Sequence, residues 1–175
     1  MKKTPHNPPH NQSSASHSPD MKAYRPGVGI VLFNADKHVL IAERIDNPGN
    51  WQMPQGGIDA GEAVEIAVFR EMEEEIGTRK AEIIGMVDDW ICYDFPAHVK
   101  KKLRTRYIGQ RQKWIALRFL GQDSDIILDT HTQPEFSRWK WVPLNDLMQY
   151  AVPFKRAVYE RVIREFKKYA EMPHI

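Results

Sequence analysis

The chain has 175 residues, a formal net charge of +2 at pH 7, and an ordinary globular composition with 42% hydrophobic and 27% charged residues, so it suits one domain with a sizeable core. Its charge is too small to indicate a nucleic-acid partner by itself, and no run of about eighteen apolar residues could span a membrane. The single cysteine, Cys92, excludes an internal disulfide and favours a reducing compartment, the cytoplasm.

Residues 1–20 differ in composition from the rest of the chain. They contain four prolines, three histidines and almost no apolar side chains, so they cannot bury enough surface to fold and are predicted to form a disordered tail. His6, His10 and His17 could bind a transition metal, but their irregular spacing favours the disordered extension. The globular domain is therefore expected to comprise residues 21–175.

The domain shows a series of strand patterns with helical patterns between and after them. Strands are predicted at residues 27–34, 38–43, 81–87, 90–93, 112–119 and 139–142, and residues 51–54 lead into Gly56-Gly57 and a long acidic helix. Two helices are predicted near the end, at residues 144–150 and 154–170. In the second one, Val158, Val162, Phe166 and Ala170 recur every four residues, which suits packing on a sheet. Strands with helices on both sides predict an α/β/α sandwich with a mixed β-sheet.

The acidic helix carries a cluster of carboxylates. Glu71, Glu74 and Glu75 stand at i, i+3 and i+4, so all three are expected to project from one side. Each like-charged pair costs a helix about 0.2–0.5 kcal/mol, a cost that a divalent cation would offset. Hard cations such as Mg²⁺ are often held by one or two carboxylates plus substrate phosphates. The cluster therefore favours metal-assisted phosphate chemistry over the alternative of a solvated acidic helix face.

The rest of this helix is expected to fix the carboxylates relative to a core. Its opposite side is apolar at helical spacing, with Phe69, Met72 and Ile76 and with Ile66 near the border. Asp59 and Glu62 form a capping-box-like start, and Gly77 fits the end. Gly56-Gly57 would let the backbone approach a ligand closely.

Residues 56–78 resemble the Nudix box, G-x5-E-x7-R-E-U-x-E-E-x-G-U, in which every fixed position is filled. The matching residues are Gly56, Glu62, Arg70, Glu71, Glu74, Glu75 and Gly77. The one departure is Thr78, where the family prefers a bulky aliphatic residue, and we expect it to affect packing rather than a ligand. The resemblance implies the Nudix fold and hydrolysis of a nucleoside diphosphate linked to another group, with Mg²⁺ or Mn²⁺ as cofactor.

Further segments are similar to one branch of that family: YRP at 24–26, WQMPQGG at 51–57, GQRQKW at 109–114, PEF at 134–136 and FKR at 154–156. The branch contains bacterial RNA pyrophosphohydrolases and asymmetric diadenosine tetraphosphate hydrolases. The resemblance implies a monomeric enzyme that removes pyrophosphate from 5′-triphosphorylated RNA, which initiates mRNA decay, and that also hydrolyses dinucleoside polyphosphates. The alternatives are a diadenosine tetraphosphate hydrolase first, a mononucleotide triphosphatase, or a catalytically inactive nucleotide-binding module.

The resemblance also implies roles for acidic residues. Glu71, Glu74 and Glu75 match the metal-binding and catalytic glutamates, and the Gly56 carbonyl matches a further metal ligand. Glu135 matches a distant carboxylate that reaches the metal cluster, although alone it would read as an ordinary loop acid. Glu74 and Glu135 are the candidates for the general base. Arg70 and Glu62 are expected to be structural, with Arg70 holding Glu74 in place four residues on.

Substrate-binding residues follow from the same branch. Arg25, Arg44 and Lys155 match basic residues that contact phosphates or nucleotide. Phe154 aligns with an aromatic residue that stacks on the base, and the alternative for it is a core residue at a helix start. Tyr93, in YDFP, resembles the dinucleotide-hydrolase members and is a further substrate-binding candidate.

Residues 100–113 contain seven basic residues and no acid. Such a stretch can follow an RNA backbone electrostatically, or it can be a solvated loop. A patch of this size exceeds what one short dinucleotide needs, so it favours RNA as the substrate.

Overall fold

The computed structural model describes residues 20–129 and 133–171. The predicted tail of residues 1–20, with its three histidines, therefore lies outside the described residues except for Asp20. The element order is η1 (Met21–Ala23), β1 (Tyr24–Phe33), β2 (Val39–Arg44), β3 (Trp51–Gln52), β4 (Gln55–Gly57), α1 (Val64–Ile76), β5 (Ala81–Met86), β6 (Ile91–Asp94), α2 (Ala97–Leu103), β7 (Gly109–Phe119), η2 (Asp123–Asp125), β8 (Phe136–Val142), η3 (Leu144–Gln149), η4 (Pro153–Lys155) and α3 (Arg156–Glu171).

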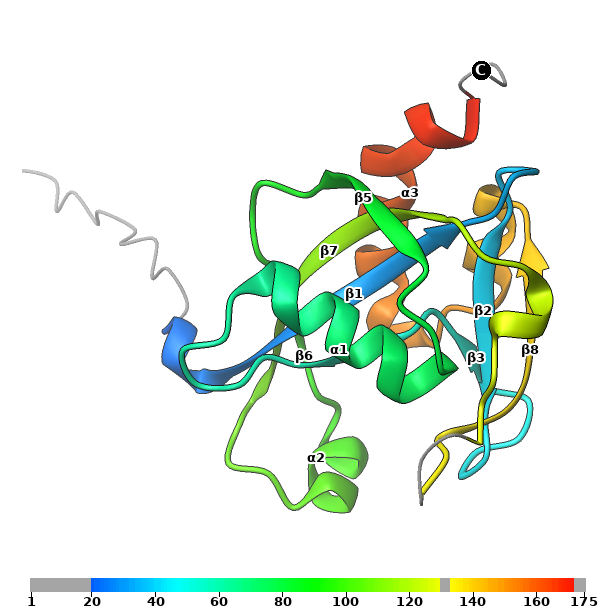
Figure 1. The fold of residues 1–175 in the computed structure, drawn as a ribbon. Helices are drawn as coiled ribbons and strands as arrows, with labels where there is room; N and C mark the ends of the chain where they lie inside the picture. Colours follow the sequence, from blue (N-terminus) through cyan, green and yellow to red (C-terminus); the bar gives the residue numbers. More distant parts are fainter. Residues whose placement is uncertain (1–19, 130–132, 172–175) are drawn as a thin grey trace, which may run out of the picture.

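Eight strands form one mixed sheet around a central parallel pair (Figure 1). Strands β1 and β7 run parallel in register from Tyr24↔Gly109 to Phe33↔Arg118. The path through the sheet is β3-β2-β1-β7-β5, and β4 pairs with β1, β6 with β7 and β8 with β2, all antiparallel. The predicted mixed sheet is therefore confirmed.

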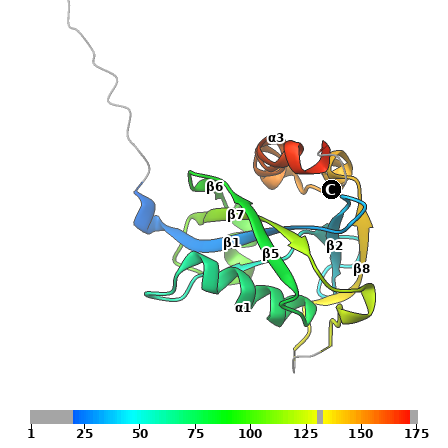
Figure 2. The ribbon, with the colours of Figure 1, turned by 45° about the horizontal axis from the view of Figure 1, so that its top comes forward.

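Helices cover both faces of this sheet, which confirms the α/β/α sandwich (Figure 2). Side chains alternate along a strand, so the two faces of β1 enter different cores. Val28, Ile30 and Leu32 pack with α1 residues, whereas Val31 and Phe33 pack with α3 residues. None of the helices within the described ranges is long and apolar enough to cross a membrane.

Helix α1 ends where expected but begins later. Gly77 has φ +75° and its N–H donates to the Glu73 carbonyl, so the predicted glycine stop is confirmed. The predicted start at Asp59 is wrong: α1 begins at Val64, after Ala63, whose side chain makes no capping bond. The Asp59 N–H does donate to the Glu62 carboxylate, but this contact shapes the loop before the helix.

The core side of α1 is also shifted slightly. Met72 and Ile76 are fully buried, as predicted, but Ile66 is 62% exposed. Ala67 and Val68 take the buried positions in the first turns instead. Thr78 is buried, and its hydroxyl accepts a bond from the Lys80 N–H, so its effect is one of packing.

Several other predicted boundaries differ from the structure. No helix was predicted at residues 97–103, which form α2 after Pro96 and include the first residues of the basic stretch 100–113. Strand β7 begins at Gly109 rather than at residue 112. The segment at 51–57 is divided into β3 and β4, because Met53-Pro54 interrupts the ladder. The helix predicted at 144–150 is the 3-10 helix η3, and the one predicted at 154–170 begins with η4 before α3.

Candidate active site

The three carboxylates on α1 do not share one environment. Glu71 and Glu75 are buried, at 8% and 6% exposure, and they face β4. The Glu74 side chain is 45% exposed at the rim of the site. The predicted cluster is thus two inward carboxylates with a third at their edge. The buried side chains of Met72 and Ile76 fix this helix against the sheet.

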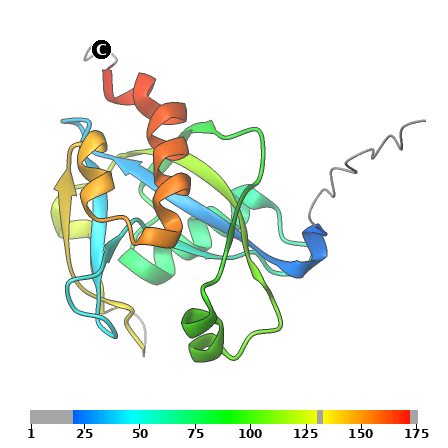
Figure 3. The same cartoon turned by 180° about the vertical axis from the view of Figure 1, so that it is seen from behind.

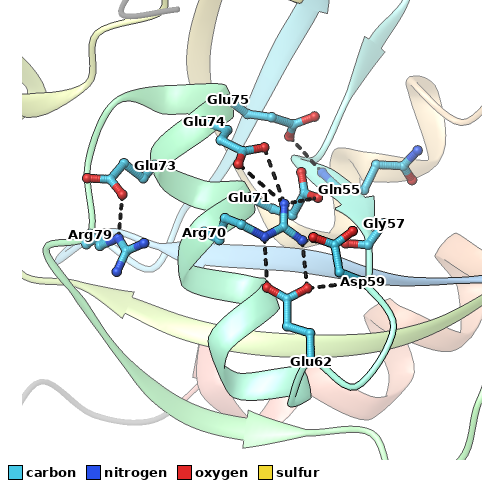
Figure 4. A network of polar contacts seen from close by, with 10 residues as sticks. All are labelled: Gln55, Gly57, Asp59, Glu62, Arg70, Glu71, Glu73, Glu74, Glu75 and Arg79. Atoms are coloured by element: carbon cyan, nitrogen blue, oxygen red, sulfur yellow. Dashed lines mark hydrogen bonds and ion pairs between the residues drawn. The ribbon is translucent and has the colours of Figure 1, made fainter.

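Arg70 joins the helix to the loop before it (Figure 4). Its guanidinium donates from Nε and Nη2 to the two oxygens of Glu62, each at 2.8 Å. It also donates to the Gly57 carbonyl at 2.8 Å, to Glu71 at 2.8 Å and to Glu74 at 3.3 Å. Arg70 was expected to hold Glu74, but its shorter contacts are with Glu62 and Glu71. This pairing lowers the pKa of Glu62 from its usual value near 4.5 to about 2.

Strand β4 brings the backbone against both buried carboxylates. A Cβ added at Gly56 would lie 1.8 Å from the Glu71 carboxyl carbon, so that carboxylate occupies the space a side chain would need. The Gln55 N–H donates to Glu75 at 2.8 Å. A side chain at residue 56 would displace the Glu71 carboxylate, which lies directly on the Gly56 main chain.

Burial and nearby negative charges raise the pKa of both buried carboxylates. Burial is the largest cause for Glu75, whose pKa lies well above 4.5, and the charges of Glu135 and Glu71 add to it. Burial likewise raises the pKa of Glu71, against the opposing effect of Arg70. Glu135, from the segment before β8, is therefore close enough to influence both. Negative charge that is this costly in the folded protein favours binding of a cation.

A divalent cation fits the chemistry of this donor set. Within residues 20–129 and 133–171, no three His, Cys, Asp or Glu side chains are grouped closely enough to hold a metal ion as they stand. Glu71 and Glu74 are engaged by Arg70 instead. Carboxylate and carbonyl oxygens are nevertheless the ligands that Mg²⁺ and Mn²⁺ prefer. Burial raises the pKa of Glu71 and Glu75, so a bound cation would stabilise their ionised forms.

Arg44 and Arg25, two of the predicted phosphate-binding residues, differ in their contacts. Arg44 donates to Asp46 at 2.6 Å and to Glu135 at 3.3 Å, so it is already paired. Arg25 is exposed on β1, and its Nη2 lies 2.7 Å from where a Cβ on Gly57 would stand. Arg25 therefore lies across the glycine loop, and Arg44 lies beside Glu135.

Lys155, Tyr93 and Phe154 form a compact group on the α3 side of the sheet. The Tyr93 and Phe154 ring centroids are 5.9 Å apart, and the Lys155 Nζ lies 5.4 Å from the Tyr93 ring centre. Burial, followed by the charge of Arg44, lowers the pKa of Lys155 to about 8. The structure thus brings these three predicted residues together, with Phe154 only partly buried.

Sequence reasoning missed a chain of glutamine side chains that connects this group to the acidic helix. Gln112 is 1% exposed and its Nε2 donates to the Oε1 atoms of Gln55 and Gln110, each at 3.0 Å. Gln110 also accepts from the Tyr93 hydroxyl at 2.7 Å, and Gln55 accepts from Lys155 at 3.2 Å. The available signal was the alternation of Gln110 and Gln112 at the start of a strand that becomes apolar from Trp114 onward, since it places two amides on one face.

Comparisons with known proteins agree with this arrangement. Residues 23–163 match the family model of the NUDIX domain. The RNA pyrophosphohydrolase of Rhodospirillum rubrum is 54% identical over 148 residues, which cover 84% of this chain and 89% of that protein. The RNA pyrophosphohydrolase of Acidiphilium cryptum is 48% identical over 152 residues, covering 85% and 93%.

Solved structures show the same fold at lower identity. The E. coli dihydroneopterin triphosphate pyrophosphohydrolase superposes with a TM-score of 0.62 at 21% identity, covering 81% of this chain and 98% of that one. The C. elegans Ap4A hydrolase binary complex gives 0.57 at 21% identity, covering 82% and 96%.

Proposed function

This chain belongs to the NUDIX family, and we propose that it is an RNA pyrophosphohydrolase, which removes pyrophosphate from the 5′ end of triphosphorylated RNA. The observation that carries the proposal is the level of identity to two relatives of that name, along more than four fifths of the chain. The proposal further states that the enzyme is a monomer and that it acts on mRNA in the cytoplasm. Removal of pyrophosphate there would initiate decay of the mRNA.

The acidic site would hold the cofactor, Mg²⁺ or Mn²⁺. Its oxygen ligands would come from the carboxylates of Glu71, Glu74, Glu75 and Glu135 and from the Gly56 carbonyl. When bound, such a cation would neutralise phosphate oxygens and lower the pKa of a water molecule for in-line attack. Glu74 and Glu135 are both about half exposed, and either would accept the proton of the attacking water.

The basic residues would bind the substrate. Arg25 and Arg44 carry permanent charges beside the acidic site and attract the phosphates. Arg44 would exchange its contacts with Asp46 and Glu135 for phosphate oxygens. Tyr93, Phe154 and Lys155 would hold the first base or its phosphate, since stacking contributes about 1–3 kcal/mol per base.

Replacement of Glu74 by glutamine tests the assignment of the acidic site. Glu74→Gln should retain the fold, because the side chain is 45% exposed, and should lose about 100-fold or more in kcat, as removal of a general base or metal ligand does. The measurement is metal-dependent pyrophosphate release from 5′-triphosphorylated RNA. Glu73→Gln, on the same helix but paired with Arg79, is the matched control. Near-normal turnover of Glu74→Gln would refute the assignment.

Hydrolysis of dinucleoside polyphosphates is the second candidate activity, favoured by Tyr93 in its YDFP context. A comparison of kcat/KM for triphosphorylated RNA and diadenosine tetraphosphate separates the two. A higher value for RNA supports the proposal, and a higher value for the dinucleotide makes the chain a dinucleotide hydrolase first. Absence of metal-dependent phosphate release from any nucleotide would make it an inactive nucleotide-binding module.

A further inference from the structure

We propose that helix α2 and the turn after it bind the RNA chain beyond its first nucleotides, a role that rests on the proposed function. The surface consists of Lys100, Lys101, Lys102, Arg104 and Arg106, and we refer to it as the α2 ridge. All five side chains are exposed. The sequence left a phosphate track and a solvated loop as alternatives for this stretch, and the structure provides three observations that favour the track.

The first observation is that α2 contributes nothing to either core. None of its seven residues is buried, and an isolated helix of this length is only marginally stable. Lys100, Lys101 and Lys102 occupy its last turn, where positive charge interacts favourably with the helix C-terminus. Helix α2 therefore exposes its charged side chains to solvent and does not contribute to core packing.

The second observation is the shortage of compensating acids. Among the described residues, Lys100, Lys101 and Arg104 form no ion pair with an acidic side chain, and the ridge has a single acidic partner, Asp46, which Lys102 contacts at 3.1 Å. Positive charge without acids attracts a polyanion, and lysine point charges bind phosphates without regard to base sequence. This is the chemistry needed for RNA chains of varied sequence.

The third observation is position. Asp46 accepts from Lys102 and also from Arg44, and Arg44 contacts Glu135, so consecutive ion pairs connect the ridge to the acidic site. At the other end of the ridge, the Ile108 N–H donates to the Ala23 carbonyl, which places the turn after α2 beside Arg25 on β1. The ridge therefore adjoins both arginines proposed to bind the 5′ phosphates.

The dimensions agree with an extension of the substrate. A seven-residue helix is about 10 Å long, which matches about three phosphates of a stacked strand. In Figure 1 α2 projects away from the sheet, and its three lysine side chains are exposed. A chain that starts at the carboxylates and continues over α2 would meet positive charge along its way.

The test compares activity on a short and on a long RNA, in the wild type and in a variant that lacks three charges of the ridge. Lys100→Gln, Lys101→Gln and Arg104→Asn are combined, which leaves the Lys102–Asp46–Arg44 contacts intact. Asparagine is chosen because residue 104 has φ +47°, a conformation that asparagine tolerates. Substrates are a triphosphorylated dinucleotide and a triphosphorylated RNA of about twenty nucleotides. The control removes three exposed charges from α3, at the opposite end of the molecule (Figure 3), as Arg164→Gln, Lys167→Gln and Lys168→Gln.

We expect kcat/KM on the long RNA to fall about tenfold near 0.1 M salt, and its salt dependence to decrease by about 2 in log–log slope for three lost contacts. Activity on the dinucleotide should be unchanged, and the α3 control should match the wild type on both. Binding of a 5′-hydroxyl RNA, which cannot be a substrate, should weaken by a similar factor.

Two results would overturn the proposal in distinguishable ways. If the wild type hydrolyses the long RNA but the variant does so equally well, or loses activity on both substrates alike, the α2 ridge has no role in binding the chain. If the wild type does not act on triphosphorylated RNA of either length, the proposed function itself fails and the ridge fails with it. A ridge that binds an acidic protein instead would give the first result.

Discussion

Gly56 and Gly57 matter because a side chain at either position would meet a neighbouring charged group. A Cβ on Gly56 would stand 1.8 Å from the Glu71 carboxyl carbon, and one on Gly57 would stand 2.7 Å from the Arg25 guanidinium. In each case the atom met is the far end of a flexible side chain, so an alanine can be accommodated if that side chain moves. The two glycines therefore position different functional groups: a proposed metal ligand and a proposed phosphate ligand.

Alanine at these two positions should separate turnover from binding. Gly56→Ala displaces the Glu71 carboxylate, so we expect kcat to fall about 100-fold, as misplacement by about 1 Å can cost. Gly57→Ala moves only Arg25, so KM for triphosphorylated RNA should rise while kcat changes little. Steady-state kinetics measure both, and thermal unfolding checks that each variant folds. Equal effects on kcat from the two changes would contradict the assignment.

Helix α1 packs on the core with one side and carries the carboxylates of the site on the other. Arg70 connects this helix to the loop and the glycine strand before it. Its partners come from the preceding loop, the glycine strand and the helix itself. This also explains the late start of α1. The Asp59–Glu62 pattern is that of a capping box, but Glu62 is turned toward Arg70, a tertiary contact that local sequence rules do not include.

Loss of Arg70 should destabilise the fold in a pH-dependent manner. Arg70→Met leaves Glu62 and Glu71 without their charged partner, at a cost of about 2 kcal/mol at neutral pH. Glu62 has its pKa lowered to about 2, so its stabilisation is complete above its unfolded value near 4.5 and is lost as the pH falls toward 2. The difference in unfolding free energy from the wild type should therefore shrink over that range.

Urea unfolding between pH 7 and pH 2.5 measures this difference. Arg79→Met is the matched control, because the Arg79–Glu73 pair is about half exposed on both sides and such pairs contribute little. A difference that stays constant with pH, or a control that loses as much stability as Arg70→Met, would show that the Arg70 contacts are not what stabilises the loop.

The domain could be predicted from sequence where its signals face a core or form a fixed motif. The apolar runs of β1 and β7 gave the central strands, and the box located the acidic helix and its glycine end. Helix α2 was missed because AHVKKKL is only seven residues long and has a single apolar i, i+4 pair, Val99 and Leu103, which is too little for helical periodicity to be recognised. Gln112 was missed because its burial depends on Gln55 and Gln110, which only the folded sheet brings to it.

The site lies where the two layers of the sandwich meet. Gln55 on β4 is the connection: its N–H donates to Glu75 of α1, and its side chain accepts from Lys155, which precedes α3. Glu75 is 6% exposed, and its burial raises its pKa despite the bond from Gln55 and the charge of Arg44. We expect that arrangement to reduce stability until a cation binds.

Glu75→Gln should therefore raise stability while abolishing activity. The raised pKa of Glu75 means that its ionised form destabilises the fold above pH 4.5, and a neutral amide can still accept the bond from Gln55. In metal-free buffer each 1 kcal/mol gained would raise Tm by about 2–4 °C for a domain of this size. Mg²⁺ or Mn²⁺ should then stabilise the wild type, by binding only its folded state, and should stabilise the variant much less.

Thermal unfolding with EDTA and with added Mn²⁺ measures both effects, and Glu160→Gln, an exposed acid on α3, is the control that should respond to the metal as the wild type does. A lower metal-free Tm for Glu75→Gln would mean that its charge is compensated within the protein. An equal rise with Mn²⁺ in both proteins would mean that the cation binds elsewhere. Since both readouts are independent of turnover, they test the metal site even if the preferred substrate is not RNA.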